Sequence, residues 1–443
     1  MHGQHARQAP LSHRQAGLLI TGALRTSPTD LMELHADLAP FDLVVNRTTY
    51  RAALRIAALP VTHPLNPRAA KAAKRYVQHH RSPLHELFRS FHIVPGIIEK
   101  KPAVLHDPTW NTPFKVVIPE TKEAALEIDR TDGADLRVYA DGSGYEKGIG
   151  AAAVLYRGSA QPRHLQLHLG SDRQHIVYEA EVCGLLLALC LIQASHFCAT
   201  ATIAIDNQAA IIGAAALRPP SCLHLWQEIG ARATALRQRG TRLTLRWVPG
   251  HADVVGNEMA DRHAKEAAEG KSTIGNLPRT LTGALPTNVA ALKAAHTKRI
   301  KAIQRSRITR DSPRYERFKD IDEEPSPKGY RALVKGLPRP MVAILTQMRL
   351  GHFPLNTYLH RIGRADADTC PACQEHRESL HHFLFQCHEH REARRSIPRR
   401  MRTYADLLAS REGLPHLFRY VKKTGRFPDA RLNLGIFDGE EWR

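Results

Sequence analysis

Apolar residues recur at helical spacing through the first part of the chain. In residues 27–59 they repeat every three to four positions, which predicts amphipathic helices. Ser27 and Asp30 are expected to cap helices at their N-termini, and Pro40 is expected to interrupt the helical pattern. Residues 1–100 are therefore predicted to form a helical segment.

A different pattern, in which short strand-like runs alternate with amphipathic helices, occupies residues 133–270. The expected order is three strands, a helix, a strand, further helices, a strand and a last helix. We place the strands at 135–144, 148–158, 164–170, 201–206 and 241–250, and the longer helices at 177–194, 222–239 and 257–270. This order predicts an α/β fold, a mixed five-stranded sheet with helices on both faces.

The remaining segments flank this α/β region. Residues 101–132 are rich in proline and are predicted to form an extended linker. Residues 271–335 contain a basic run at 298–307 and are predicted to be a basic linker with helices. Residues 336–443 are predicted to be a small helical module with a Cys/His cluster and a basic tail. The prolines of the linker are Pro102, Pro108, Pro113 and Pro119.

Composition narrows the range of functions. The chain has 443 residues, and its 63 Lys and Arg against 43 Asp and Glu give a formal net charge of +20. This excess predicts an anionic partner, either nucleic acid or a membrane surface. No apolar run approaches the ~20 residues needed to span a bilayer, and we find no signal-peptide pattern. Seven sparse cysteines favour an intracellular, reducing compartment, and they do not distinguish nucleus from cytoplasm.

Four acidic residues mark the α/β region as the candidate site. Asp141 and Asp206 end predicted strands, whereas Glu181 and Asp261 lie in predicted helices. Two carboxylates ~4 Å apart repel by ~4 kcal/mol at an effective dielectric constant of ~20, so a converging set needs cations. Oxygen ligands of this kind favour two Mg²⁺ or Mn²⁺ ions, which can activate water and stabilise a leaving oxygen at a phosphodiester.

The motifs DGSG, AE, IDNQ and WVPGH…GNEMAD, in this order over residues 133–270, resemble type 1 ribonuclease H. The resemblance implies that Asp141, Glu181, Asp206 and Asp261 hold the metal ions, the first and third bridging them. It also implies that His251 assists proton transfer or product release. The further residues that it implies for nucleic-acid contact are Gly142, Ser143, Gln208 and Asn257.

Each of these residues also has a simpler interpretation. A D-G-S-G sequence is usually a turn, an Asp at a strand end is often a helix cap, and a His after Pro-Gly can belong to an ordinary loop. Glu179 competes with Glu181, and Glu258 competes with Asp261, although the helical geometry lets only one acid of each pair face the site. Asp253 is expected at the surface of the loop.

Two departures from the family pattern affect the expected substrate. Many members place an Asn pair before the catalytic Glu to read the RNA 2′-hydroxyl, and here those positions hold Val177 and Tyr178. RNA-strand selectivity is therefore less secure than phosphodiester cleavage. The stretch LRPPSC, at 217–222, is also too short for the basic handle of cellular bacterial enzymes. The grip on the substrate must come from elsewhere, and the flanking segments are basic.

A second cluster follows the pattern C-x2-C-x8-H-x4-C, with Cys370, Cys373, His382 and Cys387. Three thiolates and an imidazole suit a tetrahedral, structural Zn²⁺, although buried thiols in a helix are the simpler alternative. His381 is an alternative ligand to His382. The other four cysteines lie at apolar helical positions and are expected to be core residues: Cys183, Cys190, Cys198 and Cys222.

The Cys/His cluster and the preceding residues 347–370 resemble the zinc-binding-like module at the C-terminus of non-LTR retrotransposon reverse transcriptases. Residues 20–43 resemble the segment that connects polymerase to ribonuclease H in fungal elements. We find no Tyr/Phe-x-Asp-Asp polymerase motif, so DNA synthesis is not expected. The resemblance thus implies a C-terminal fragment that lacks the polymerase.

Taken together, these features predict a metal-dependent endonuclease that hydrolyses the RNA strand of RNA–DNA hybrids. Its basic runs at 298–307, 388–402 and 421–426 are expected to contact phosphates, although each alone could be a solvated helix face. The alternatives are an inactive nucleic-acid-binding remnant of a retroelement and a ribonuclease H-like nuclease acting on DNA. No membrane partner is expected, and protein partners are unknown.

Overall fold

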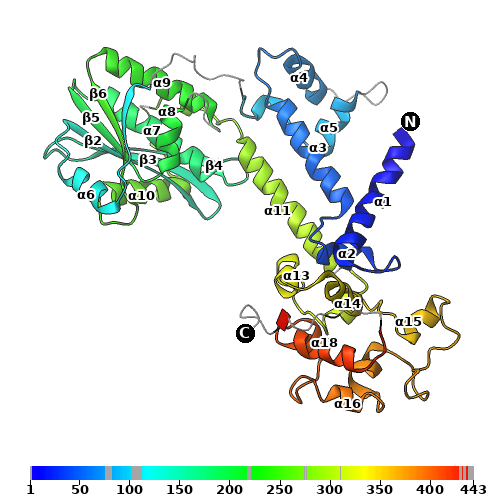
Figure 1. The fold of residues 1–443 in the computed structure, drawn as a ribbon. Helices are drawn as coiled ribbons and strands as arrows, with labels where there is room; N and C mark the ends of the chain where they lie inside the picture. Colours follow the sequence, from blue (N-terminus) through cyan, green and yellow to red (C-terminus); the bar gives the residue numbers. More distant parts are fainter. Residues whose placement is uncertain are drawn as a thin grey trace. The chain divides into compact units, whose positions relative to one another are not determined.

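The computed structural model describes most of the chain, in two compact units (Figure 1). The sheet unit comprises Arg47–Lys298, and the helical unit comprises Met1–Asn46 with Arg299–Arg443. Each unit is described by itself below. The described residues are 2–74 (2–9 for the backbone only), 82–101, 112–216, 221–273, 275, 277–309, 311–428, 432 and 436–437.

The sheet unit is built on a mixed sheet with the strand order β1-β6-β5-β2-β3-β4. The first four strands of this order are parallel, and β3 and β4 are added antiparallel to β2. Three sequence-adjacent strands are therefore hairpin-connected, while the others return through helices. The strands are β1 (Phe114–Val117), β2 (Leu136–Tyr145), β3 (Gly148–Tyr156), β4 (Arg163–Ser171), β5 (Thr200–Ile205) and β6 (Arg242–Trp247).

Helices cover both faces of the sheet because successive strand residues point to opposite sides. On β2, Val138 packs into the larger core with helices α7, α8 and α9, whereas Tyr139 packs into the smaller core beside α6 and α10. Helix α7 is buried along nearly its whole length, which its apolar run predicted. The helices are α6 (Lys122–Arg130), α7 (Val177–Gln193), α8 (Gln208–Ala215), α9 (Leu223–Gln238) and α10 (Val255–Ala268).

The expected α/β fold is confirmed, but the sheet has six strands in the described part of the chain rather than five. The sixth is β1, which pairs with β6 from Phe114↔Leu243 onward, and α6 follows it. The Pro-rich segment 101–132 was predicted as a linker, and this prediction is wrong for residues 114–130. Pro113 and Pro119 flank the short strand and conceal it, while Pro102 and Pro108 lie outside the described residues.

Helices that precede and follow the α/β region in the sequence complete the sheet unit. Their core contains Leu54, Phe88, Ile98 and Val289, which bring residues before the sheet together with the start of α11. The elements here are α3 (Phe41–Ala57), α4 (Asn66–Lys74), α5 (Pro83–Phe91), the 3₁₀ helices η1 (Pro95–Ile97) and η2 (Arg279–Leu281), and α11 (Val289–Ile308). Helices α3 and α11 each cross the division between the units.

The helical unit consists of the 20-residue helix α1 and a series of shorter helices, and it has one large apolar core. Helix α2 begins after Pro28 rather than at a Ser27 or Asp30 cap, and α3 begins directly after Pro40 as expected. In the described part of the chain, no helix is long and apolar enough to cross a membrane. The helices are α1 (His2–Thr21), α2 (Thr29–His35), α12 (Tyr315–Phe318), α13 (Pro327–Val334), α14 (Arg339–Arg349), α15 (Asn356–Arg361), the π-helix η3 (His382–Gln386), α16 (Arg391–Arg394), α17 (Tyr404–Leu408) and α18 (Gly413–Lys423).

The units do not follow the predicted domain boundaries. The predicted N-terminal segment, 1–100, is divided between the two units at Asn46, and the predicted basic linker, 271–335, is divided at Lys298. The helical unit is therefore assembled from two stretches that are far apart in the sequence. Such long-range association cannot be read from local hydrophobic periodicity.

Candidate active site and Cys/His cluster

Three acids converge at one edge of the sheet. Asp141, Glu181 and Asp206 can each offer a carboxylate oxygen such that these atoms all lie within 4.8 Å of one another. The strands explain the convergence, because β2 and β5 are parallel neighbours with Ala140 opposite Ile205. The next residue in each case is an acid, because Asp141 continues β2 and Asp206 directly follows the last residue of β5, so both acids reach the same edge.

Two glycines bring the third acid to this edge. A Cβ atom at Gly142 would lie 2.3 Å from the backbone nitrogen of Glu181, and one at Gly184 would lie 3.1 Å from the Asp141 carbonyl oxygen. Glycine at these positions lets helix α7 approach β2 much more closely than a larger residue would allow. This close approach sets Glu181 beside Asp141.

The acids destabilise one another electrostatically. Burial, followed by the charges of Asp206 and Asp261, raises the pKa of Asp141 to about 7. Burial and the charges of Asp141 and Asp206 also raise the pKa of Glu181 well above its usual value. The Oε2 atom of Glu181 is buried without a hydrogen-bond partner. A buried, mutually repelling set of oxygen ligands of this kind fits a divalent cation.

The fourth predicted acid, Asp261, lies near the three but is differently engaged. Its charge raises the pKa of both Asp141 and Asp206, while its Oδ2 atom lies 2.6 Å from the Lys265 ammonium nitrogen one helical turn away. It is outside the group of three whose oxygens approach within 4.8 Å. Glu258, the rival acid on α10, likewise lies outside that group.

His251 lies in the loop that passes Asp206. A Cβ atom at Gly250 would be 2.7 Å from the Oδ2 atom of Asp206. Burial raises the pKa of this acid, and the neighbouring His251 partly opposes that shift. His251 is exposed and has a positive φ of 52°. The imidazole therefore stands at the solvent side of the acid cluster. Asp253, predicted at the loop surface, is also exposed.

The predicted nucleic-acid contacts differ in accessibility. Asn257 is 3% exposed, and its side chain hydrogen-bonds the Asp206 carboxylate, so it supports the acid cluster from inside the protein. Gln208 is exposed at the first residue of α8, Ser143 is half-buried, and Gly142 is buried against α7. Gln208 and Ser143 are thus the members of this set that a ligand can reach.

The rival acid Glu179 belongs to a separate buried network. It is fully buried, and its Oε2 atom lies 3.1 Å from Nδ1 of His175. It points away from the Asp141 cluster because it is about 200° around the helix from Glu181. The helical argument that only one of the two acids faces the cluster agrees with this placement.

Glu99, which sequence reasoning missed, anchors the same network. Its carboxylate is 1% exposed and accepts hydrogen bonds from the Cys222 nitrogen (3.1 Å) and the Val289 nitrogen (2.9 Å). Asn288, which is fully buried, donates to Oγ of Ser221 at 3.1 Å. Glu99 precedes the sheet region in the sequence and Val289 follows it, so these hydrogen bonds link both flanking segments to the start of α9. The only local signal was an acid at the end of the apolar run Ile97–Ile98.

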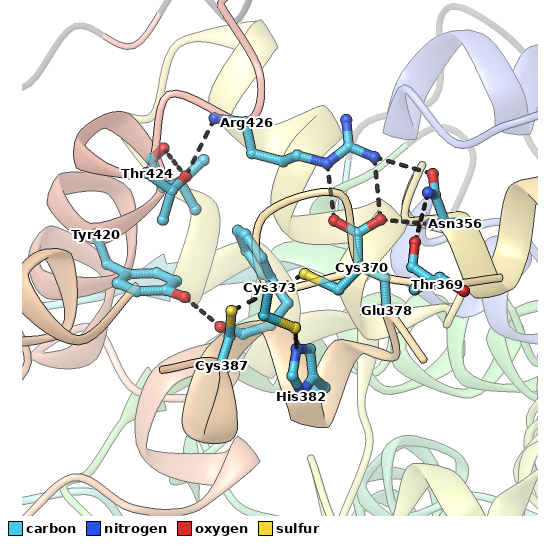
Figure 2. A network of polar contacts seen from close by, with 12 residues as sticks. Asn356, Thr369, Cys370, Cys373, Glu378, His382, Cys387, Tyr420, Thr424 and Arg426 are labelled. Atoms are coloured by element: carbon cyan, nitrogen blue, oxygen red, sulfur yellow. Dashed lines mark hydrogen bonds and ion pairs between the residues drawn. The ribbon is translucent and has the colours of Figure 1, made fainter. Parts of the chain in front are cut away.

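The Cys/His cluster closes around one point in the helical unit (Figure 2). Cys370, Cys373, His382 and Cys387 are all buried, and one ligand atom from each lies within 4.8 Å of the others. The Sγ atoms of Cys370 and Cys387 are 3.9 Å apart, and Cys373 Sγ is 3.5 Å from Nε2 of His382. The structure places His382 in the group, whereas His381 is exposed and contacts the rings of Phe385 and Tyr404.

Backbone geometry favours ionisation of one thiol of this cluster. Burial works against ionisation of Cys373, but hydrogen bonds from the backbone of Glu375 and His376 lower its pKa to about 6. The turn is made by Gln374, whose φ is 58°. A lowered thiol pKa increases the thiolate fraction, which is the form that binds metal.

A buried ion pair holds the cluster to the rest of the unit (Figure 2). The carboxylate of Glu378, fully buried, accepts hydrogen bonds from Arg426 at 2.7 and 3.0 Å and from the Asn356 nitrogen at 2.6 Å. Tyr420 donates to the carbonyl oxygen of Phe383, on the helix that carries His382. The four remaining cysteines are free and buried in the sheet unit, as predicted for core residues.

Comparison with known proteins agrees with this fold. Residues 133–269 match the family model of RNase H. The mixed sheet with helices on both faces is an RNase H-like fold, and the match to this family covers residues 133–269 of the longer chain. No curated protein matches the chain.

Three solved structures are similar to parts of the chain. The N-terminal RNase H domain of Rv2228c from Mycobacterium tuberculosis, solved as a fusion with maltose-binding protein, has 20% identity and a TM-score of 0.24, over 30% of this chain and 98% of that one. RNase H1 from Halobacterium salinarum NRC-1 has 21% identity and a TM-score of 0.24, over 31% and 98%. LC9-RNase H1, a type 1 RNase H with the type 2 active-site motif, has 21% identity and a TM-score of 0.27, over 33% and 76%.

Proposed function

We propose that the chain is a metal-dependent endonuclease that hydrolyses the RNA strand of RNA–DNA hybrids. The observation that carries this proposal is the convergence of Asp141, Glu181 and Asp206 within 4.8 Å inside the RNase H domain. Their raised pKa values and the Glu181 oxygen without a hydrogen-bond partner indicate that a cation bound here would stabilise the three carboxylates. Mg²⁺ or Mn²⁺, as two ions, suits this all-oxygen set.

Each residue has a separate role in this proposal. Asp141, Glu181, Asp206 and Asp261 would hold the two ions, which when bound supply an activated water and stabilise the leaving oxygen. Asn257 orients the Asp206 carboxylate through its hydrogen bond, and the Lys265 ammonium group, 2.6 Å from Oδ2 of Asp261, fixes the position of that carboxylate. His251, exposed beside Asp206, carries a proton between the reacting phosphodiester and solvent.

Contacts to the hybrid would come from the accessible residues at the same edge. Ser143 and Gln208 present side chains that can reach the sugar–phosphate backbone. Val177, 41% exposed at the first residue of α7, and Tyr178 cannot supply the paired amides that read a 2′-hydroxyl in many relatives. We therefore expect strand selection to depend on shape and backbone contacts.

The direct test is cleavage of a labelled RNA–DNA hybrid by the full-length protein. We expect Mg²⁺-dependent products with 3′-hydroxyl and 5′-phosphate ends, and a decrease of about 10³-fold or more with Asp206→Asn, because it removes several kcal/mol of transition-state stabilisation. Asp253→Asn is the matched control, since Asp253 is exposed in the neighbouring loop, and it should retain the rate.

The outcomes separate this proposal from its alternatives. Folded protein that cuts no hybrid and shows no heat of Mg²⁺ binding at millimolar metal would indicate an inactive nucleic-acid-binding remnant. Cleavage of duplex DNA without cleavage of hybrid would indicate a nuclease acting on DNA. Full activity of Asp206→Asn would contradict the assigned metal-binding set.

We further propose that the Cys/His cluster binds one structural Zn²⁺. Support comes from four buried ligands of the right chemistry and from the lowered pKa of Cys373. The module, together with the segment at 20–43, also supports a non-LTR retrotransposon origin of the chain, from a fungal element, and with it an intracellular location.

A further inference from the structure

One cavity in the helical unit lies apart from both the acid cluster and the Cys/His cluster. It has a volume of about 340 Å³, and its walls come from α2, α12, the end of α14 and α15. Leu31, Phe318 and Met348 form its apolar floor and belong to the core of the unit. This volume is at the small end of the range for ligand pockets, which suits a single ring system and its substituents.

Three arginines surround the opening, namely Arg314, Arg317 and Arg361. Arg317 and Arg361 are exposed and form no ion pair among the described residues. Arg314 lies 3.6 Å from Asp30 and remains about half exposed. Asp320 is the acid among the described lining residues, so the rim retains a positive excess.

The fourth arginine in the wall serves the fold. Arg349 is 2% exposed and donates to Asp322 (2.7 Å), to Nε2 of His35 (2.9 Å) and to the Leu408 carbonyl oxygen (2.6 Å). All of its nitrogen groups are thus engaged. This contrast indicates that Arg317 and Arg361 are not needed to satisfy internal partners.

The arginines at the rim also affect a histidine in the cavity wall. Burial, followed by the charges of Arg361 and Arg314, lowers the pKa of His352 to about 4, so its ring is neutral near pH 7. The ring centroid of His352 lies 5.1 Å from that of Tyr358, and the Arg361 guanidinium lies 5.3 Å from the same Tyr358 ring. His352 therefore supplies an uncharged planar ring to the cavity wall, while Tyr358 is buried and contacts both His352 and Arg361 without lining the cavity itself.

We propose that this cavity binds an unpaired nucleotide of single-stranded nucleic acid. The base would lie on the apolar floor beside the His352 ring, and its phosphates would be bound by Arg317 and Arg361. A base within a duplex is stacked and cannot enter a cavity of this size without being extruded. An acidic peptide shares part of this chemistry, and the choice of nucleic acid over it rests on the proposed nuclease function.

The test measures binding without added divalent cation, so that no cleavage can occur. Fluorescence anisotropy compares a labelled 12-nucleotide single strand with the corresponding 12-base-pair duplex on the full-length protein. The variant is Arg317→Ala with Arg361→Ala. The matched control is Arg364→Ala with Lys335→Ala, which removes two exposed cationic side chains of the same unit outside the cavity and outside the basic runs.

We expect the cavity variant to bind the single strand about tenfold more weakly at 0.1 M salt. Its plot of log affinity against log salt should be less steep by about 1.4, because each phosphate contact on a single strand contributes about 0.7. The control and the duplex affinity should change less than twofold. Circular dichroism and a thermal melt check that the variant is folded.

Other results overturn the inference. Equal losses in the cavity variant and the control would reduce the effect to general charge. Unchanged single-strand affinity would exclude the cavity, and a polyglutamate probe that binds only the protein with both arginines would identify an acidic peptide as the ligand. Because no cleavage is measured, failure of the proposed nuclease activity would leave these readouts intact and is distinguishable.

Discussion

The acid cluster and the Cys/His cluster both gather ligand atoms within 4.8 Å, but they differ in almost every other property. The acid cluster has oxygen ligands, raised pKa values and an exposed loop with His251 beside it. The Cys/His cluster has sulfur and nitrogen ligands, all buried, and a thiol with a lowered pKa at Cys373. One is open and internally repulsive, and the other is closed.

The difference shows how burial and the number of ligands distinguish a structural metal site from a catalytic one. A closed set of four ligands leaves no position for substrate and contributes to folding. An open set that lacks positive charge leaves positions for water and a phosphodiester oxygen. Replacing a ligand residue should therefore lower the free energy of unfolding at the Cys/His cluster and, without metal, raise it at the acid cluster.

The largest expected effect is loss of the ligand set in the helical unit. Cys370→Ser should reduce bound zinc from about one per chain to well below one and should destabilise the helical unit, because structural zinc contributes roughly 10 kcal/mol or more. Elemental analysis and a thermal melt measure this. Cys198→Ser, which changes a buried thiol of the sheet unit, should leave the zinc content unchanged.

The same measurements can contradict the proposed zinc site. Less than about one zinc per wild-type chain, with no loss of stability in Cys370→Ser, would remove the zinc site. Hybrid cleavage measured after zinc removal, with Mg²⁺ supplied, should persist if the two clusters act separately.

A smaller effect is expected from a buried acid that is satisfied without metal. Glu99→Gln replaces one acceptor oxygen by an amide donor opposite the Cys222 and Val289 nitrogens, and it should lower the free energy of unfolding by about 3 kcal/mol. Urea unfolding of the full-length protein measures this change. Glu120→Gln is the control because Glu120 is exposed. An equal effect of both changes would contradict the role of this network.

The smallest effect, expected for Asp141, is a stabilisation rather than a loss of stability. The pKa of Asp141 is about 7 in the folded protein against 3.8 as its ordinary value, so the folded state binds more protons between these values. The stability contribution of this group therefore falls as pH rises from about 4 to about 7. Without metal at pH 8, Asp141→Asn should raise the free energy of unfolding by about 2 kcal/mol, and below pH 4 it should change little.

Urea unfolding at pH 8, without and with Mg²⁺, measures this difference. Added Mg²⁺ should stabilise the wild type and should stabilise Asp141→Asn less. If Asp141→Asn instead lowered the free energy of unfolding of the metal-free protein, repulsion between the acids would not destabilise the fold. The acid cluster would then not differ from the Glu99 network in this respect.

The sequence predicted those features that follow from local pattern and motif order. Strands β2 to β6, α7 and α10 were expected because apolar periodicity sets them, and the match to the RNase H family over residues 133–269 agrees with the expected span. Ligand spacing likewise predicted the Cys/His group that the structure brings together.

Features that depend on distant pairing were missed. Strand β1 has four residues between prolines, and only its ladder with β6 makes it a strand. The choice of His382 over the adjacent His381 depends on the π-helix that turns one ring inward. Asn257 was expected to face nucleic acid, but packing of α10 buries it against Asp206. Each of these outcomes is set by tertiary contacts that no local window contains.

Strand β1 also has a consequence for self-association. It covers the outer side of β6, and it lies outside the span that matches the RNase H family. A shorter protein that begins at residue 133 would leave the backbone groups of β6 (Arg242–Trp247) unpaired along one side. Such a bare edge is a template for a strand from another molecule. The short, proline-flanked strand thus protects the domain against aggregation.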